Sequence, residues 1–200
     1  MRIACLLVAL LLCTAVVQAG SLDLPRNHYP LVVSDWISIS YDPNGGGGGN
    51  GLFTASGFTN VVEMTAEDTH PAHFGSFELT AVIDPNTGQQ KGGSLFLTEL
   101  DDYGDPTTLF SSSSILNFGF SAEDLFEFTF QQESGTLAPL GATVGVILDG
   151  RQISEFSEPR FDISFSGDGS ATSDTFYLPE PASASLLILG GLGLLRRKQA

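Results

Sequence analysis

The sequence predicts an all-β protein, an antiparallel two-sheet sandwich of the jelly-roll or immunoglobulin-like type. Through the middle of the chain, apolar and polar residues alternate in short runs, which is the period of a strand with one buried face. Turn-forming residues separate these runs, and no segment there sustains the 3.6-residue apolar repeat of a helix. Eight or nine short strands with this spacing are typical of a sandwich, and an up-and-down barrel is the alternative.

Six alternating runs each place their apolar residues on one side. They cover residues 37–41, 77–83, 116–120, 126–130, 144–148 and 161–165. In the third run, Leu116, Phe118 and Phe120 are expected to share the buried face. The chain has 15 phenylalanines, and its two cysteines both lie in the N-terminal apolar segment, so aromatic packing replaces disulfides in the predicted core.

Turn chemistry lies between the runs. The sequence Asp-Pro-Asn-Thr-Gly at residues 84–88 predicts a hairpin between the strand at 77–83 and one near 94–100. Asp149-Gly150 predicts a second tight turn. The segment at 42–49, which ends in five glycines, predicts a loop, and residues 121–124 allow at most one helical turn.

Residues 1–19 have the organisation of a signal peptide. A basic start precedes an apolar stretch of roughly 15 residues, which is too short for an ordinary membrane-spanning helix. Small residues then predict cleavage by signal peptidase between Ala19 and Gly20. The alternatives are an uncleaved anchor and a lipoprotein modified at Cys13, where Leu12 stands in place of the small residue normally needed.

The C-terminal segment, residues 179–200, also has three parts. They are the motif Pro179-Glu180-Pro181, an uncharged apolar stretch at 182–195 and the basic cluster Arg196-Arg197-Lys198. As a helix, the apolar stretch would cover about 21 Å of the roughly 30 Å hydrocarbon core. The basic cluster would hold its far end in the cytoplasm by the positive-inside rule. The sequence therefore predicts an acidic β domain at 20–178, followed by a short apolar helix.

This tail resembles the PEP-CTERM sorting signal, which combines a Pro-Glu-Pro motif, a short apolar helix and a basic end. The resemblance implies a bacterium that makes extracellular polysaccharide and processing of the tail by an exosortase, a membrane-embedded cysteine protease. It also implies transient anchoring in the inner membrane, then delivery to the cell envelope or outside the cell. Residues 75–150 resemble a β-rich module of other secreted PEP-CTERM proteins that has no assigned activity. The alternatives for the tail are a Gram-positive cell-wall sorting signal, whose Thr-Gly pair is missing here, and a plain tail anchor.

The charge balance excludes one class of partner. Residues 20–178 contain four basic and 22 acidic residues, a net charge of 4 minus 22, or −18. Such a surface repels phosphate backbones, so we expect no binding to nucleic acid. The sequence also contains no nucleophile elbow, phosphate-binding loop or dinucleotide fingerprint, and we expect neither catalysis nor a cofactor.

Calcium is the metal that the sequence favours. Asp101, Asp102 and Asp105 cluster in one predicted turn, and Asp168 and Asp174 belong to a second acidic, glycine-rich predicted loop. Carboxylates on flexible loops suit a hard cation such as calcium.

Zinc is disfavoured at the pair His70 and His73, because Pro71 between them breaks the helix that would present both.

Two features bear on polysaccharides. Glu123 and Glu127 form a carboxylate pair that a glycosidase could use, although solvated surface is the favoured interpretation. The aromatic candidates for stacking on sugar are Trp36, Tyr41, Tyr103 and Tyr177. The predicted function is a non-enzymatic secreted or cell-envelope protein, a component of or binder in the extracellular polysaccharide matrix. The alternative is a secreted carbohydrate-binding module or polysaccharide-active enzyme.

Overall fold

A computed structural model describes residues 21–24, 28–120, 125–137, 139–150 and 161–176. Several predicted features lie outside these residues: the signal peptide with its cleavage site between Ala19 and Gly20, the helical turn at 121–124 and the tail from residue 179.

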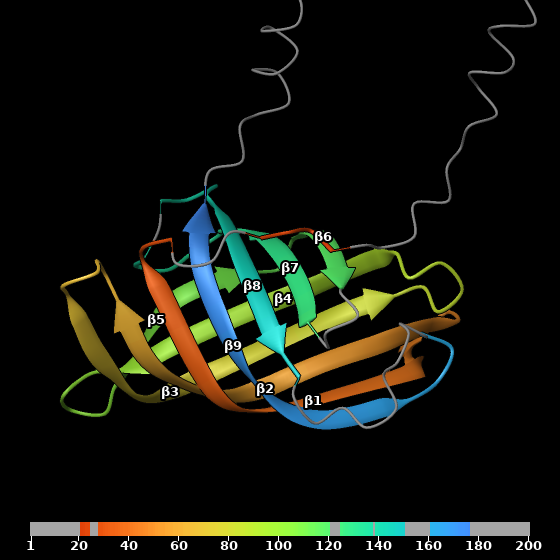
Figure 1. The fold of residues 1–200 in the computed structure, drawn as a ribbon, viewed down its shortest axis with the longest axis horizontal. Helices are drawn as coiled ribbons and strands as arrows, with labels where there is room; N and C mark the ends of the chain where they lie inside the picture. Colours follow the sequence, from red (N-terminus) through yellow and green to blue (C-terminus); the bar gives the residue numbers. More distant parts are fainter. Residues whose placement is uncertain (1–20, 25–27, 121–124, 138, 151–160, 177–200) are drawn as a thin grey trace, which may run out of the picture.

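The described part of the chain forms one sheet of nine antiparallel strands (Figure 1). The strands are β1 (Leu31–Gly47), β2 (Asn50–Glu63), β3 (Thr69–Ile83), β4 (Gln90–Leu100), β5 (Pro106–Ser112), β6 (Ile115–Phe120), β7 (Leu125–Gln131), β8 (Thr143–Asp149) and β9 (Phe165–Phe176). The prediction of an all-β antiparallel protein is confirmed.

The strand order is β5-β4-β3-β2-β1-β9-β8-β7-β6. Strands that follow each other in the chain are neighbours, except that β1 lies beside β9 while β5 and β6 stand at opposite ends of the order. Ladder pairing runs from β5 to β6 without a break, so the expected division into two separate sheets is not confirmed. The up-and-down order also differs from the Greek-key order of jelly-roll and immunoglobulin-like sandwiches. Residue alternation could not distinguish these orders, because it reports which face is buried and not which strands are neighbours.

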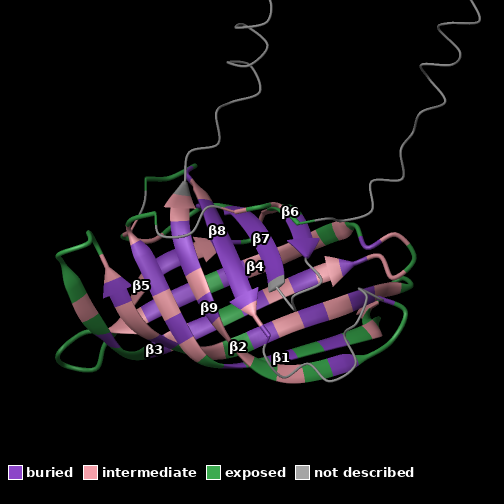
Figure 2. Ribbon diagram, in the orientation of Figure 1, coloured by how far each residue is buried: buried purple, intermediate pink, exposed green. Residues whose placement is uncertain are grey.

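The sheet curls so that its two halves pack against each other. In Figure 1, β7, β8 and β9 cross over β2, β3 and β4. The ring of Phe53 on β2 lies 5.1 Å from that of Phe126 and 5.3 Å from that of Phe128, both on β7, measured between centroids. Since three strands separate β2 from β7 in the sheet, these contacts require the halves to face each other. Buried residues alternate with exposed or partly exposed ones along the strands (Figure 2), and the buried apolar residues of both halves form one core cluster. We call the side of the sheet that faces away from this core its outer face.

The buried faces follow the predicted alternation closely. The apolar residues expected to point inward in the runs at 37–41, 77–83, 126–130 and 144–148 are all buried. Leu116 is an exception and is 36% exposed. The pairing of β6 with β7 shifts register between Ile115 and Asn117, which puts Leu116 out of phase with the buried Phe118 and Phe120.

Local structure confirms one turn and corrects two other predictions. The hairpin at 84–88 is confirmed: the N–H of Asp84 donates to the carbonyl of Gln89, and the N–H of Gly88 to that of Asp84. The loop predicted at 42–49 is wrong in extent, because β1 continues to Gly47, opposite Asn50 of β2. Glycines at positive φ then close this longer hairpin.

The strand predicted at 161–165 is also wrong in extent. Strand β9 begins only at Phe165. Phe161 is nevertheless buried, and it packs on the ring of Tyr41 at a centroid distance of 5.4 Å. The alternating pattern therefore correctly predicted that Phe161 is buried, although this residue does not lie in a strand.

Candidate functional site

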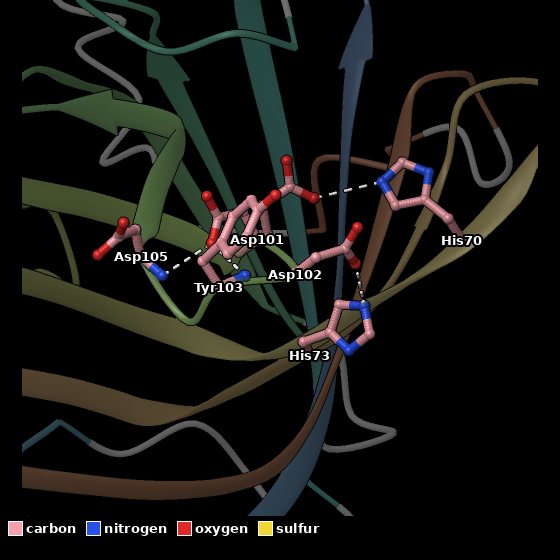
Figure 3. Close-up of polar contacts among 7 residues, drawn as sticks. His70, His73, Asp101, Asp102, Tyr103 and Asp105 are labelled. Carbon is pink, nitrogen blue, oxygen red and sulfur yellow. Dashed lines mark hydrogen bonds and ion pairs between the residues drawn. The ribbon is translucent and has the colours of Figure 1, made fainter.

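The acidic loop between β4 and β5 uses its first carboxylate to hold its own backbone (Figure 3). The carboxylate of Asp101 accepts hydrogen bonds from the N–H groups of Tyr103 and Asp105, each at 2.9 Å. Further backbone bonds join Asp101 with Gly104 and Asp105. Of the three candidate calcium ligands Asp101, Asp102 and Asp105, the first therefore uses its carboxylate to stabilise a turn.

The two candidate histidines contact separate carboxylates. Nε2 of His70 lies 3.2 Å from Oε2 of Glu99, and Nε2 of His73 lies 3.8 Å from Oδ1 of Asp102 (Figure 3). Each pair ties β3 to the end of β4 or to the loop after it. Among the described residues, no three His, Cys, Asp or Glu side chains are grouped so that they could hold a metal ion.

The second predicted calcium loop is a strand. Asp168 and Asp174 both lie in β9, where Asp168 is opposite Ser38 and Asp174 is opposite Leu31. Six residues of extended chain separate them by about 20 Å, so they cannot share one ion. The loop prediction was wrong because serine and glycine are typical turn residues. In this segment they belong to β9, which pairs with β1 from Phe165 to Asp174.

Glu127 is buried, which corrects the expectation that this glutamate is solvated surface; Glu123 lies outside the described residues. Glu127 is only 5% exposed, because residues 21–24 lie against it. Its carboxylate accepts hydrogen bonds from the hydroxyl of Ser21 at 2.8 Å and from the N–H groups of Leu22 at 2.6 Å and Leu24 at 2.9 Å. We call this segment, together with His28, the N-terminal strap.

A second carboxylate holds the other end of the strap. The N–H of His28 donates to Oδ2 of Asp174 at 3.2 Å. Burial raises the pKa of Asp174 above its ordinary value, and the bond from His28 acts in the opposite direction. Glu127 and Asp174 are therefore anchors for the strap on the outer face of β7 and β9, a role that sequence spacing alone gave no signal to predict.

The structure separates the four aromatic candidates. Tyr41 is buried, its hydroxyl donates to the carbonyl of Phe161 at 2.9 Å, and burial raises its pKa to about 12. It is therefore a core residue and no ligand contact. Tyr103 is exposed on the β4–β5 loop, Trp36 is exposed on β1, and Tyr177 lies outside the described residues.

Trp36 belongs to an exposed aromatic row that crosses three neighbouring strands. The row consists of Trp36 on β1, Phe58 on β2 and Phe74 on β3, which are 81%, 49% and 67% exposed. Phe58 lies opposite Asp35, the residue before Trp36, and its ring contacts that of Phe74 edge-on at a centroid distance of 6.3 Å. We call these three residues the aromatic row. Sequence reasoning identified Trp36 alone, because its two partners lie in runs that were not recognised as strands.

Both ends of this row lie at irregularities of the sheet. The β1–β2 register shifts between Asp35 and Ser38, and the β2–β3 register shifts opposite Asn60. In these bulges Trp36 and Phe74 adopt positive φ angles of 57° and 63°. Such values are unfavourable for bulky residues and concentrate at functional positions.

Hydroxyl groups occupy the outer face beside the aromatic row. Ser40, Thr54, Thr80 and Ser94 stand opposite one another on β1 to β4, and we call them the hydroxyl row. They are joined in two pairs, with oxygen–oxygen distances of 2.7 Å for Ser40 and Thr54 and 2.8 Å for Thr80 and Ser94. Along β2, Thr54 is four residues from Phe58, a separation of about 13 Å. This face thus combines flat apolar rings with fixed hydroxyl groups.

Comparison of the chain with protein-family models, with curated proteins and with solved structures found no match. The structure contains, within its described ranges, no helix with the length and apolar character needed to traverse a membrane.

Proposed function

We propose that this protein is a non-enzymatic exported protein that binds extracellular polysaccharide through its aromatic row. The observation that carries the proposal is the exposure of Trp36, Phe58 and Phe74 on the adjacent strands β1, β2 and β3, with the rings of Phe58 and Phe74 in contact. Aromatic rings this exposed are costly in water unless a partner covers them. In this proposal the polysaccharide is that partner.

The chemistry of the face supports a sugar ligand. A pyranose ring presents C–H groups on its flat sides and hydroxyl groups around its rim. Aromatic rings pack against such C–H faces, while hydroxyl and amide side chains exchange hydrogen bonds with the rim. The outer face supplies aromatic rings and polar groups. The amide of Asn60 lies beside the aromatic row and donates to Asp35 at 3.0 Å, and the hydroxyl row lies about 13 Å from Phe58 along β2.

Export is the second part of the proposal and rests on the ends of the sequence. A signal peptide would direct the chain across the inner membrane, and the PEP-CTERM-like tail would deliver it to an exosortase. Until the tail is processed, its apolar helix would keep the protein in the inner membrane. The curled sheet, whose two halves pack face to face as in a sandwich, would then be presented to the polysaccharide outside.

Affinity electrophoresis tests the binding. The exported protein is run through gels that contain the extracellular polysaccharide of the producing bacterium, and the polymer should retard it. Trp36→Ala, Phe58→Ala and Phe74→Ala should each raise the dissociation constant by up to about tenfold, since a lost ring contact is worth up to about 1.5 kcal/mol.

Leu140→Ala is the matched control. Leu140 is an exposed apolar residue before β8, so its removal changes exposed apolar surface without touching the row. Retardation equal in the wild type, in the row variants and in this control would contradict the proposal, as would no retardation at all.

A further inference from the structure

We infer that the aromatic row binds an uncharged polysaccharide, of a type whose rings carry equatorial hydroxyl groups, and that it does so without a metal ion. This inference rests on the proposed function and names the ligand class of the same site. Three observations carry it: the span of the row, the hydrogen-bonding groups beside it and the charges of the strands that form it.

The row is wide enough for a polymer and not only for one sugar ring. Neighbouring strands lie about 4.8 Å apart, so the distance from β1 to β3 is about 10 Å, and a short run of sugar rings spans it. The Phe58 and Phe74 rings meet edge-on and therefore offer differently oriented surfaces. A chain that twists from ring to ring suits such a surface better than a flat single sugar.

The ring geometry of the ligand follows from the exposure of the aromatics. Equatorial hydroxyl groups leave both sides of a pyranose flat and apolar, so a side chain as exposed as Trp36 can cover one side fully. An axial hydroxyl would stand between the two rings and lose its water without gaining a bond. The hydroxyls at the rim would then meet the side-chain amide of Asn60, which Asp35 holds in place beside Phe58.

The charges of these strands disfavour an acidic polymer. Strands β1, β2 and β3 contain no lysine or arginine, and their acidic residues are Asp35, Asp42, Glu63 and Glu78. The whole chain has a formal net charge of −15. A polymer of uronic acids or sulfated sugars would approach carboxylates of its own sign with no cation on these strands to compensate.

A bridging metal ion is not needed for this mode of binding. Asp35 beside the row is hydrogen-bonded to Asn60, and Glu78 stands on β3, two strands away from it. Carboxylates placed singly do not form the multi-oxygen shell that calcium requires. Ring stacking and neutral hydrogen bonds remain as the source of affinity.

Two soluble polymers with the same β-glucan backbone test the charge and metal requirements. Hydroxyethyl cellulose is neutral, and carboxymethyl cellulose carries carboxylates. We expect the full exported protein to be retarded by the neutral polymer equally in chelator and in millimolar calcium. At low salt, carboxymethyl cellulose should bind about tenfold more weakly, with the gap narrowing as salt screens the repulsion.

The single tryptophan gives a direct readout of the site. Trp36 is the only tryptophan in the chain, so its fluorescence should change when the neutral polymer covers it. At low salt, the same change should require about tenfold more of the acidic polymer. Phe58→Ala and Phe74→Ala should shift the fluorescence titration to about tenfold higher polymer concentration, whereas Leu140→Ala should not. Urea unfolding of each variant verifies that it is folded.

The outcomes separate this inference from the proposed function. Preferred binding of carboxymethyl cellulose, or binding that requires calcium, would overturn the inference and leave polysaccharide binding standing. If the native polysaccharide retards the protein and neither cellulose derivative does, the inference that the sugar rings carry equatorial hydroxyl groups would be overturned. If none of the three polymers retards the protein, the proposed function itself would be overturned.

Discussion

Trp36 and Phe74 keep a backbone conformation that their own side chains disfavour. Left-handed φ costs a residue with a Cβ atom roughly 1–2 kcal/mol, and glycine has no such cost. Both residues are highly exposed, so little packing energy compensates for this strain. A side chain retained at such a position is more readily explained by binding than by folding.

A pair of variants at Trp36 separates strain from side-chain chemistry. We expect Trp36→Gly to be more stable than Trp36→Ala by about 1 kcal/mol, because only glycine relieves the positive φ. Both variants should weaken polysaccharide binding to the same extent. Urea unfolding measures the stability difference, and equal midpoints for the two variants would show that the bulge relaxes when the indole is removed.

The carboxyl of Asp174 makes stability depend on pH in an identifiable direction. Burial raises its pKa in the folded state, so the folded protein binds this proton more tightly than the unfolded chain does. The contribution of the group to stability is therefore greatest below the ordinary value of 3.8. It declines as pH rises from that value through the raised pKa.

Asp174→Asn removes this titration and keeps an oxygen that can accept from His28. As pH rises from 3 to 7, the free energy of unfolding of the wild type should fall relative to that of the variant and then level off. Taking the difference at each pH cancels the carboxyl groups that the two proteins share. A difference that is constant or rises with pH would contradict the assignment.

At the scale of the elements, three of the hydrogen bonds that hold the N-terminal strap end on the carboxylate of Glu127. Glu127→Ala would leave the N–H groups of Leu22 and Leu24 without their acceptor and should destabilise the protein by about 1–3 kcal/mol. Hydrogen exchange at these two amides should accelerate at the same time. Glu127→Gln, which keeps one acceptor oxygen, should have a smaller effect.

Glu78→Ala serves as the control for this prediction, because Glu78 is an exposed glutamate on β3, away from the strap. It should change neither stability nor exchange at Leu22 and Leu24. Unchanged exchange in Glu127→Ala would mean that the strap is held by other contacts.

Strand faces could be predicted from the sequence, and register could not. Alternation identified the buried side of most runs because a pleated strand turns successive side chains to opposite faces. Leu116 was misplaced because a bulge restarts that alternation, and the bulged residues Trp36 and Phe74 left no periodic signal either. The buried state of Glu127 depends on a segment about 100 residues away in sequence, which no local pattern records.

At the scale of the whole molecule, strand order was the limit of prediction. The pairing of β1 with β9 joins segments more than a hundred residues apart, and nothing in either strand specifies the other. The net charge of the molecule, in contrast, follows from composition alone, because it is a property of the chain and not of its fold.

The proposed path of export predicts the mass of the mature protein. Protein isolated from the envelope or medium of its producer should begin at Gly20 and end near the motif at 179–181, as intact mass measurement would show. Deleting residues 178–200 should change the location of the protein and abolish the C-terminal cut. A mass that extends to Ala200 would instead make the tail a permanent anchor.

The adjacency of β1 and β9 has a mechanical consequence. Leu31, where β1 begins, lies opposite Asp174, close to the end of β9 at Phe176. A pulling force applied between residues 31 and 176 therefore acts on neighbouring ends of two antiparallel strands. It would load their hydrogen bonds one pair at a time and open the ladder like a zipper, whereas strands pulled from opposite ends must break many bonds together. A domain stretched in this way yields at low force and extends gradually, so it would cushion a load between its two ends instead of resisting it.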